Sequence, residues 1–150
     1  MSVELHFKPS RIDDDYETPP ELVKLLCEKF QVTPLIDVAA TSKNRKFTIF
    51  FSKEDNALDQ DWTLDCWCNH PHTLHKEFVE KAYNEWQKHN ITIMMIIPSN
   101  TGRTKYWHKF IEPYAEYKMI KGNIRFLKDG KPTKDAARNG YVCVIWRKII

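Results

Sequence analysis

A short polar turn, Asn69-His70-Pro71-His72, follows an apolar segment and carries groups suited to binding an amine. The Asn69 side chain provides an amide oxygen that accepts hydrogen bonds, and the backbone carbonyl of His70 provides a second acceptor. Pro71 stiffens the turn and has no N–H group that competes for these acceptors. The flat ring of His72 could stack on a planar ligand. The turn could therefore hold an amino group on a heteroaromatic ring; alternatively, Asn69 and His72 cap a helix that starts near Thr73.

A second candidate site lies in the apolar run at residues 35–39, which one carboxylate, Asp37, interrupts. The small residues Ala39 and Ala40 follow it. Small side chains after a buried strand let a ligand approach the backbone closely, a position that glycine usually fills. The more common interpretation of such a carboxylate is that it caps its own loop. Both interpretations stay open at this point.

Potential metal ligands alternate along the chain at Cys66, Cys68, His70 and His72. On a single strand these four side chains would point the same way. Zinc accepts such ligands, but one strand cannot wrap them tetrahedrally around an ion without a bend. Alternating cysteines on a buried strand belong more often to the core, so we expect no metal.

Composition and charge place the chain among folded proteins with a basic C-terminal third. The 150 residues are 42% hydrophobic and 13% aromatic, which excludes a disordered or collagen-like chain. Residues 1–100 hold 11 Lys/Arg and 16 Asp/Glu, whereas residues 101–150 hold 12 and 4. This asymmetry indicates a surface that faces a polyanion, or simply a solvated basic surface. No apolar run reaches the roughly 18 residues of a membrane span, and the first residues do not resemble a signal peptide.

The spacing of apolar residues predicts strands that alternate with helices. Residues 1–15 are expected to form a flexible arm, and residues 16–150 a single domain. Thr18 and Glu21 are expected to form a capping box, with Pro19 at the first position of a helix that ends near Phe30. Further helices are expected from residue 73 and around residues 107–114, and a polar basic loop is expected at 128–140. The strands are expected at 35–39, 47–51, 64–68, 91–97, 116–120, 124–127 and 141–147. This order predicts an α/β fold, an open sheet with helices on both faces, which binds ligands beyond the carboxyl ends of its strands.

The cysteines and tryptophans are expected to be structural. The four cysteines include no C-x-x-C pair, and without a secretion signal we expect them to be reduced and mostly buried. Core packing is the preferred role for Trp62, Trp67, Trp107 and Trp146. The 91–97 run is apolar except for Thr92, which is typical of a parallel strand covered on both faces.

Six segments occur together in an order that resembles one known family. They are Asp15-Tyr16-Glu17-Thr18-Pro19, Leu35-Ile36-Asp37-Val38-Ala39-Ala40-Thr41, Glu54-Asp55-Asn56-Ala57-Leu58 with Asp61-Trp62, Trp67-Cys68-Asn69-His70-Pro71-His72, the strand that ends in Pro98, and Gly122-Asn123-Ile124-Arg125-Phe126. The set is similar to the small phage-type (Dam-like) DNA adenine-N6 methyltransferases, which are compact class I methyltransferases dependent on S-adenosylmethionine (SAM). The resemblance implies a Rossmann-like sheet and methyl transfer from SAM to the N6 amine of adenine in DNA, in a prokaryotic or phage-infected cytoplasm.

The resemblance also assigns roles to individual residues. The family's Asn-Pro-Pro-Tyr motif reads Asn-His-Pro-His here, so Asn69, His70, Pro71 and His72 are the candidate catalytic residues, with His72 stacking in place of tyrosine. This departure leaves a catalytically altered or inactive SAM or nucleic-acid binder as the alternative. The residues expected at SAM are Tyr16, Thr18, Pro19, Asp37, Ala39 and Ala40, with Asp55 or Asp61 at its ribose or adenine amine. The residues expected at DNA are Arg103, Lys105, Lys121, Arg125, Lys128, Lys131, Lys134 and Arg138.

Overall fold

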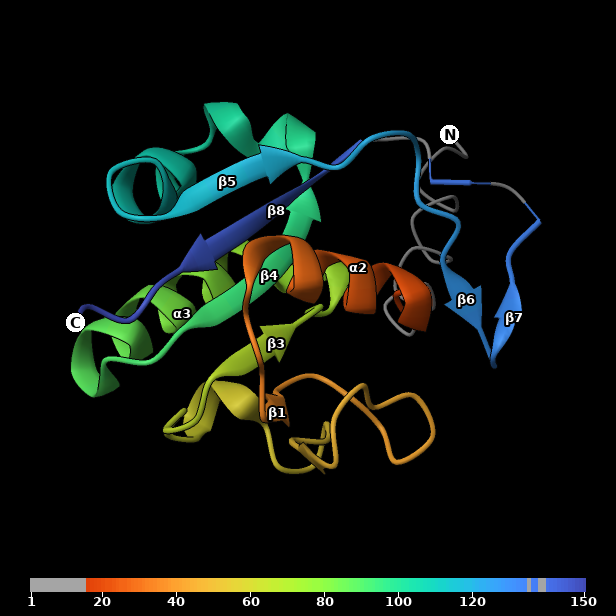
Figure 1. Cartoon of the computed structure of the whole chain (residues 1–150), viewed down its shortest axis with the longest axis horizontal. Coiled ribbons are helices and arrows are strands. Elements are labelled where there is room, and N and C mark those ends of the chain that lie inside the picture. The colour runs from red at the N-terminus through yellow and green to blue at the C-terminus, as the bar shows by residue number, and fades with distance from the viewer. Residues whose placement is uncertain (1–15, 135, 138–139) are drawn as a thin grey trace, which may run out of the picture.

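A six-stranded sheet organises the chain, with strand order β2-β1-β3-β4-β8-β5 (Figure 1). The computed structural model describes residues 16–134, 136–137 and 140–150, so the arm expected at 1–15 lies outside the described residues. The strands in sheet order are β2 (Ile49–Phe50), β1 (Ile36–Asp37), β3 (Cys66–Cys68), β4 (Ile93–Pro98), β8 (Tyr141–Trp146) and β5 (Glu116–Met119). The first four run parallel, whereas β8 runs antiparallel to β4 and to β5.

Helices cover both faces of this sheet, which confirms the predicted α/β class (Figure 1). Helix α2 (Pro20–Phe30) and helix α3 (His75–His89) contribute to two separate apolar clusters. Alternate residues of β4 point to opposite clusters, with Met95 on the α3 side and Met94 on the α2 side. This is why the strand shows no polar alternation in sequence. None of the helices in the described part of the chain is long and apolar enough to cross a membrane.

The capping box predicted for the first helix is wrong. The helix begins at Pro20, its N-cap position is Pro19, and no side chain within the described residues caps it. Proline suits the first helical position because its missing N–H would lack an intrahelical partner there anyway. The second proline of the pair takes that position, which displaces Thr18 by one residue and frees its hydroxyl for another partner.

The strand predicted at 124–127 is also wrong. Ile124 and Phe126 are buried, as their alternation with polar residues predicts. Among the described residues, however, the segment meets isolated backbone partners, such as the N–H of Ala137, which donates to the carbonyl of Ile124. The regular pairing starts later, in a hairpin of β6 (Leu127–Lys128) and β7 (Lys131–Pro132) within the predicted basic loop. Its turn residues have positive φ angles of 54° and 79°, the geometry that an Asp-Gly pair favours in tight hairpins.

Two expected helices differ locally from the prediction. The one expected from residue 73 begins as a 3₁₀ turn, η4 (His72–Leu74), before α3. The helical segment near residue 107 is a π-helix, η6 (Trp107–Ile111). Burial of three cysteines and of Trp62, Trp67, Trp107 and Trp146 is confirmed.

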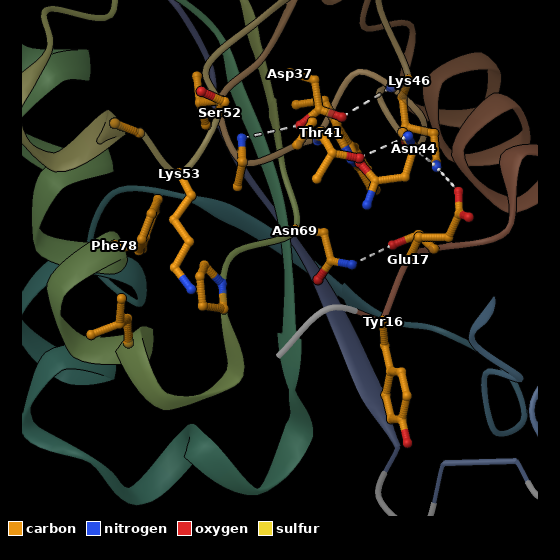
Figure 2. A pocket seen from close by; sticks show the side chains of 18 of the residues that line it. Tyr16, Glu17, Asp37, Thr41, Asn44, Lys46, Ser52, Lys53, Asn69 and Phe78 are labelled. Atoms are coloured by element: carbon orange, nitrogen blue, oxygen red, sulfur yellow. Dashed lines mark hydrogen bonds and ion pairs between the residues drawn. The ribbon is translucent and has the colours of Figure 1, made fainter. Parts of the chain in front are cut away.

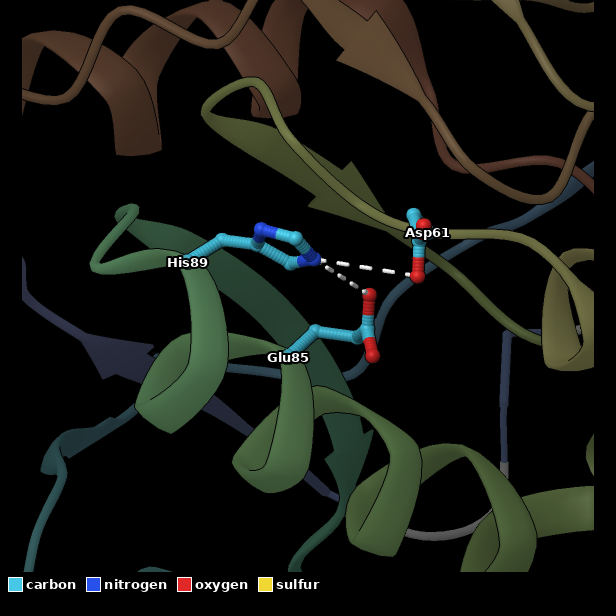
Figure 3. A group of neighbouring side chains, drawn as sticks. All are labelled: Asp61, Glu85 and His89. Carbon is cyan, nitrogen blue, oxygen red and sulfur yellow. Dashed lines mark ion pairs between the residues drawn. The ribbon is translucent and has the colours of Figure 1, made fainter.

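A buried carboxylate on α3 anchors the loop before β3. Glu85 is 5% exposed, and its Oε1 accepts a 2.6 Å hydrogen bond from the backbone N–H of Trp62. Lys81 lies 3.4 Å from its other oxygen, and His89 lies 3.6 Å from Oε1 (Figure 3). Glu85 therefore joins a loop that has little regular structure to the helix beneath it.

Replacement of Glu85 by leucine should lower the free energy of unfolding by about 1–3 kcal/mol, because it leaves the buried Trp62 N–H without a partner. Urea unfolding followed by tryptophan fluorescence measures this change. The matched control is Glu80→Leu at an exposed position of the same helix. Equal stability of the two variants would contradict the anchoring role.

Candidate active site

A cavity of about 400 Å³ opens at the carboxyl ends of β1 and β3 (Figure 2). Residues from four segments line it: 16–18, 37–46, 52–57 and 67–78. The parallel ladder pairs Asp37 with Trp67, so the chain leaves both strands at the same edge of the sheet. Ligands of open α/β sheets bind at such edges. The two sites considered separately in the sequence are therefore one pocket.

Asp37 both caps its own loop and lines the pocket, the two interpretations that the sequence left open. Its carboxylate accepts hydrogen bonds from the N–H groups of Ala39 (3.2 Å) and Lys46 (3.0 Å), so it caps its own loop. It also lines the pocket. Burial raises the pKa of Asp37 to about 6, although the hydrogen bonds from Lys46 and Ala39 oppose the shift. The result is a carboxylate at the pocket wall that ionises near neutral pH.

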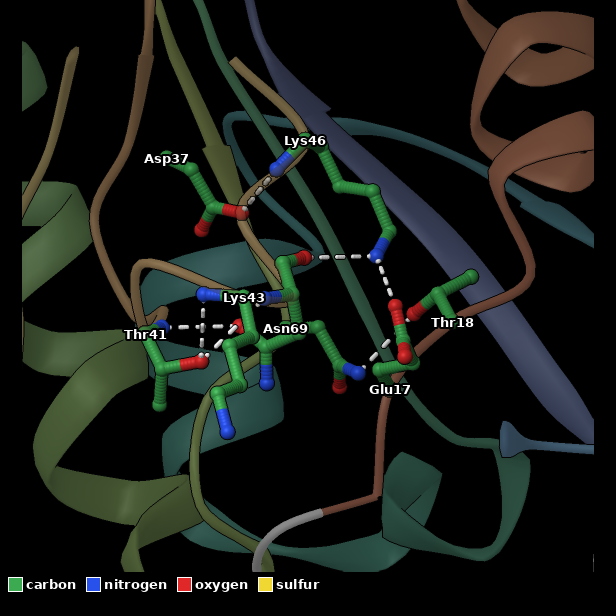
Figure 4. Close-up of polar contacts among 8 residues, drawn as sticks. Glu17, Thr18, Asp37, Thr41, Lys43, Lys46 and Asn69 are labelled. Carbon is green, nitrogen blue, oxygen red and sulfur yellow. Dashed lines mark hydrogen bonds and ion pairs between the residues drawn. The ribbon is translucent and has the colours of Figure 1, made fainter. Parts of the chain in front are cut away.

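An ion pair ties the segment before α2 to the rim of the pocket. The Nζ atom of Lys46 lies 2.6 Å from the Glu17 carboxylate, and both side chains are mostly buried. The same Nζ donates to the carbonyl of Asn44 at 2.7 Å (Figure 4). Asn44 in turn caps the N–H of Thr41 at 2.7 Å. Glu17 belongs to a segment that carries the resemblance and Asn44 lies near another, but the sequence assigned no role to them or to Lys46, because their partners are remote or lie within an irregular loop.

The Asn69 amide is held by a residue far away in the sequence. Its Nδ2 donates a 2.8 Å hydrogen bond to the hydroxyl of Thr18, whose residue is 1% exposed. Figure 4 shows the two side chains meeting at the pocket wall. Because a side-chain amide is planar, fixing Nδ2 directs Oδ1 to the opposite side, where it can accept a hydrogen bond from a ligand.

The two histidines of the turn have different environments. The His70 ring is buried, stacks on Phe78 with centroids 5.5 Å apart, and meets His75 edge-on. Burial holds the pKa of His70 well below its usual value, and His75 and His72 add to this effect. His70 is thus neutral and packed under the turn, and it does not line the pocket with its ring. His72 is exposed and contacts His75 at a centroid distance of 5.0 Å.

The residues predicted at the donor fall into two groups. Tyr16, Thr18, Asp37, Ala39 and Ala40 line the pocket, whereas Pro19, Asp55 and Asp61 are not among its lining residues. The Asp55 carboxylate accepts hydrogen bonds from the N–H and the hydroxyl of Ser52, at 2.8 and 2.9 Å. Asp61 pairs with Lys88 at 3.2 Å.

Lys53 and Asn56 line the pocket, but neither had been given a role at the donor, although Asn56 lies in one of the segments that carry the resemblance. Their position in the sequence could have indicated a place at the pocket. Both follow the second strand of a parallel sheet, and the carboxyl ends of parallel strands share one edge.

The alternating Cys66, Cys68, His70 and His72 are not among the potential metal ligands that converge within the described residues. Both cysteines belong to the core, where burial raises their pKa values. The group of possible ligands that does converge, among the residues that the structure describes, is Asp61, Glu85 and His89 (Figure 3). Lys88 and Lys81 already neutralise these carboxylates, so we assign the cluster a structural role.

The hairpin brings Lys128 of the predicted basic set close to the pocket. The hairpin joins the pocket segment through two 2.8 Å backbone hydrogen bonds between Glu17 and Leu127. The Lys128 ammonium lies 5.2 Å from the centroid of the Tyr16 ring. The Arg125 guanidinium already donates hydrogen bonds to the backbone carbonyls of Thr133 and Lys134. The exposed members of the predicted set are Arg103, Lys105, Lys121, Arg125, Lys131 and Lys134; Arg138 lies outside the described residues.

Comparisons with known proteins agree with this architecture. A family model described as DNA N-6-adenine-methyltransferase (Dam) matches residues 7–150. A DNA N-6-adenine-methyltransferase of Escherichia phage T1 is 29% identical over 139 residues, which cover 91% of this chain and 56% of that protein. One of Haemophilus phage HP1 is 30% identical over 108 residues, covering 71% of this chain and 62% of that protein. The chain thus spans less than two thirds of the length of these curated relatives. Because the family model matches nearly every residue, the chain belongs to the DNA N-6-adenine-methyltransferase (Dam) family.

Proposed function

We propose that this chain transfers a methyl group from SAM to the exocyclic N6 amine of adenine in DNA. One observation carries the proposal: the Asn69 amide and the Asp37 carboxylate, from neighbouring strand ends, line the same cavity. A carboxylate suits a cationic donor, and an amide oxygen suits an aromatic amine. The relatives' names support the same reaction.

The volume and lining of the cavity support binding of a donor of this size and charge. Its volume of about 400 Å³ lies within the roughly 300–1,000 Å³ of small-molecule sites. The buried Asp37 carboxylate would attract positive charge, and the small Ala39 and Ala40 leave the backbone accessible. Lys53 and Asn56 would offer polar contacts on the wall formed after β2. Asp55 and Asp61 stay predictions for the ribose or the adenine amine.

The donor supplies an electrophilic methyl group on a sulfonium when bound. The protein's task is to prepare the adenine amine, whose lone pair is delocalised into the ring and is therefore a poor nucleophile. In our proposal, Asn69 Oδ1 and the His70 carbonyl accept the two N–H bonds, which favours a pyramidal nitrogen with a localised lone pair. These acceptors also stabilise the positive charge that develops on the nitrogen. Pro71 keeps the turn rigid, so that alignment is largely set before the substrate binds.

DNA binding would involve the hairpin and the basic residues near the pocket. A base inside a duplex cannot reach the cavity and must leave the stack. Lys128, next to Tyr16, and the exposed Lys131 would contact phosphates near the pocket, which gives affinity without sequence information. His72 would stack on the extruded adenine from its exposed position at the start of η4.

Replacement of Asn69 by alanine should lower kcat for methyl transfer by at least about 100-fold, the typical effect of losing one hydrogen bond that stabilises transition-state charge. SAM affinity should change by less than about threefold, because Asp37 and the loop after β1 stay intact. Tritiated SAM with adenine-containing DNA measures transfer, and calorimetry measures binding.

The control for this experiment is Asn84→Ala at an exposed position of α3. Equal rates for Asn69→Ala and wild type would refute the catalytic assignment. A wild-type protein that binds SAM and DNA but transfers no methyl group would instead favour the binding-only alternative.

SAM affinity should fall on acidification through pH 6. A cation next to Asp37 binds best when the carboxylate is ionised, and the pKa of Asp37 in the free protein is about 6. At pH 5 about a tenth of the carboxylate is ionised, so the dissociation constant should rise by up to about tenfold relative to pH 7.5. Calorimetry at both values tests this. Asp37→Asn should remove most of the pH dependence, whereas the control Glu112→Gln, at an exposed position that does not line the pocket, should keep it. An unchanged pH dependence in Asp37→Asn would exclude contact between Asp37 and the cation.

A further inference from the structure

The hydrogen bond between Thr18 and Asn69 has a consequence that follows from the chemistry of the amide. The two ends of the Asn69 side chain have similar size, but only Oδ1 can accept an N–H bond, whereas Nδ2 only donates. A rotation of the amide by 180° would therefore present a donor to the substrate amine and abolish its activation. The active turn needs a group that selects one of the two orientations.

We propose that Thr18 is this positioning residue: its hydroxyl accepts the Nδ2–H bond of Asn69 and thereby directs Oδ1 toward the substrate amine. The inference rests on the proposed function. The hydrogen bond is 2.8 Å long, and Thr18 is 1% exposed. Water therefore competes little with the hydroxyl for the amide.

Other contacts hold the residues on both sides of Thr18. Its neighbour Glu17 exchanges two backbone hydrogen bonds with Leu127 of the hairpin, each 2.8 Å long. The Glu17 carboxylate pairs with Lys46 at 2.6 Å, and the N–H of Lys46 binds Asp37. On its other side, Thr18 adjoins Pro19, where α2 starts. Backbone pairing, an ion pair and a helix start thus hold one short segment against the Asn69 side chain.

The hydroxyl has no competing role in α2. The helix has Pro19 at its N-cap position and receives no side-chain cap within the described part of the chain. A threonine that served only the fold could therefore be exchanged for its isostere valine with little effect on catalysis. An orienting threonine could not.

The first experiment compares kcat of Thr18→Val and Thr18→Ser with that of wild type. The valine variant should lose about tenfold in kcat, equivalent to about 1.4 kcal/mol, while the serine variant, which keeps the hydroxyl, should stay within about threefold. The control is Thr92→Val, because Thr92 is also buried and its hydroxyl accepts the N–H of Lys148 far from the pocket. Full activity of Thr18→Val, or an equal loss in Thr92→Val, would overturn the proposal.

The second experiment uses the symmetry of a carboxylate. In an Asn69→Asp background both side-chain oxygens are acceptors, so no orientation needs to be selected. Adding Thr18→Val to Asn69→Asp should then change kcat by less than about twofold. An undiminished tenfold loss would show that Thr18 acts through the fold and not through the amide.

A third measurement does not depend on turnover. In ¹⁵N-labelled free protein, the Asn69 side-chain NH₂ signal should show slowed hydrogen exchange that Thr18→Val abolishes and Thr18→Ser retains. Unchanged hydrogen exchange in Thr18→Val would refute the hydrogen bond between Thr18 and Asn69. If the Asn69→Asp variant is inactive, this exchange measurement decides the question. A wild-type protein without methyl transfer would refute the proposed function, whereas active wild type with an equally active Thr18→Val would refute only the positioning role.

Discussion

The parallel register between β1 and β3 is the constraint on which the pocket depends. Asp37 pairs with Trp67 across this ladder, so the carboxylate and the Asn69 turn leave the sheet side by side. A slip of one residue would turn each side chain of a strand to the opposite face. Asp37 would then turn away from the Lys46 N–H group that holds it, and the pocket would lose its anionic wall. Burial of Ile36 and Val38, which flank Asp37 and belong to the α3-side cluster, makes such a slip costly, because it would turn both side chains away from that cluster.

The elements that bury the most apolar surface could be predicted from sequence. The 91–97 run and the helix that ends at Phe30 depend on burial and periodicity, which adjacent residues reveal. The order of the strands could not be predicted, since β8 comes last in sequence but lies between β4 and β5. The 124–127 segment shows the limit of pattern reading. The alternation of apolar and polar residues in this segment correctly indicates burial. A strand also needs a partner strand in register, and in the described residues regular pairing begins at Leu127.

The site could be predicted only in part, for a related reason. Asp37 and Asn69 stand next to apolar runs, and the rule about strand ends applies to them directly. The Thr18 hydroxyl, in contrast, has its partner 51 positions away, and Lys46 has Glu17 29 positions away. Local patterns instead suggested a helix cap for Thr18, because capping partners are always close in sequence. Asp55 was expected at the donor because it lies in a segment that carries the family resemblance, whereas the chain turns that carboxylate back onto Ser52.

The lengths of the strands imply an uneven distribution of local stability. β1 and β2 have two residues each, whereas β4 and β8 have six each and pair along their whole length. The half of the sheet that carries the pocket is thus held by few backbone hydrogen bonds between strands. Side-chain hydrogen bonds and ion pairs, such as those of Asp37 and Lys46, add to its stability. Regions of this kind open more readily than the rest of a fold, and ligands that bind them suppress the opening. Backbone amides around the pocket should therefore exchange with solvent through partial unfolding, while those of β4 and β8 exchange only when the whole domain unfolds.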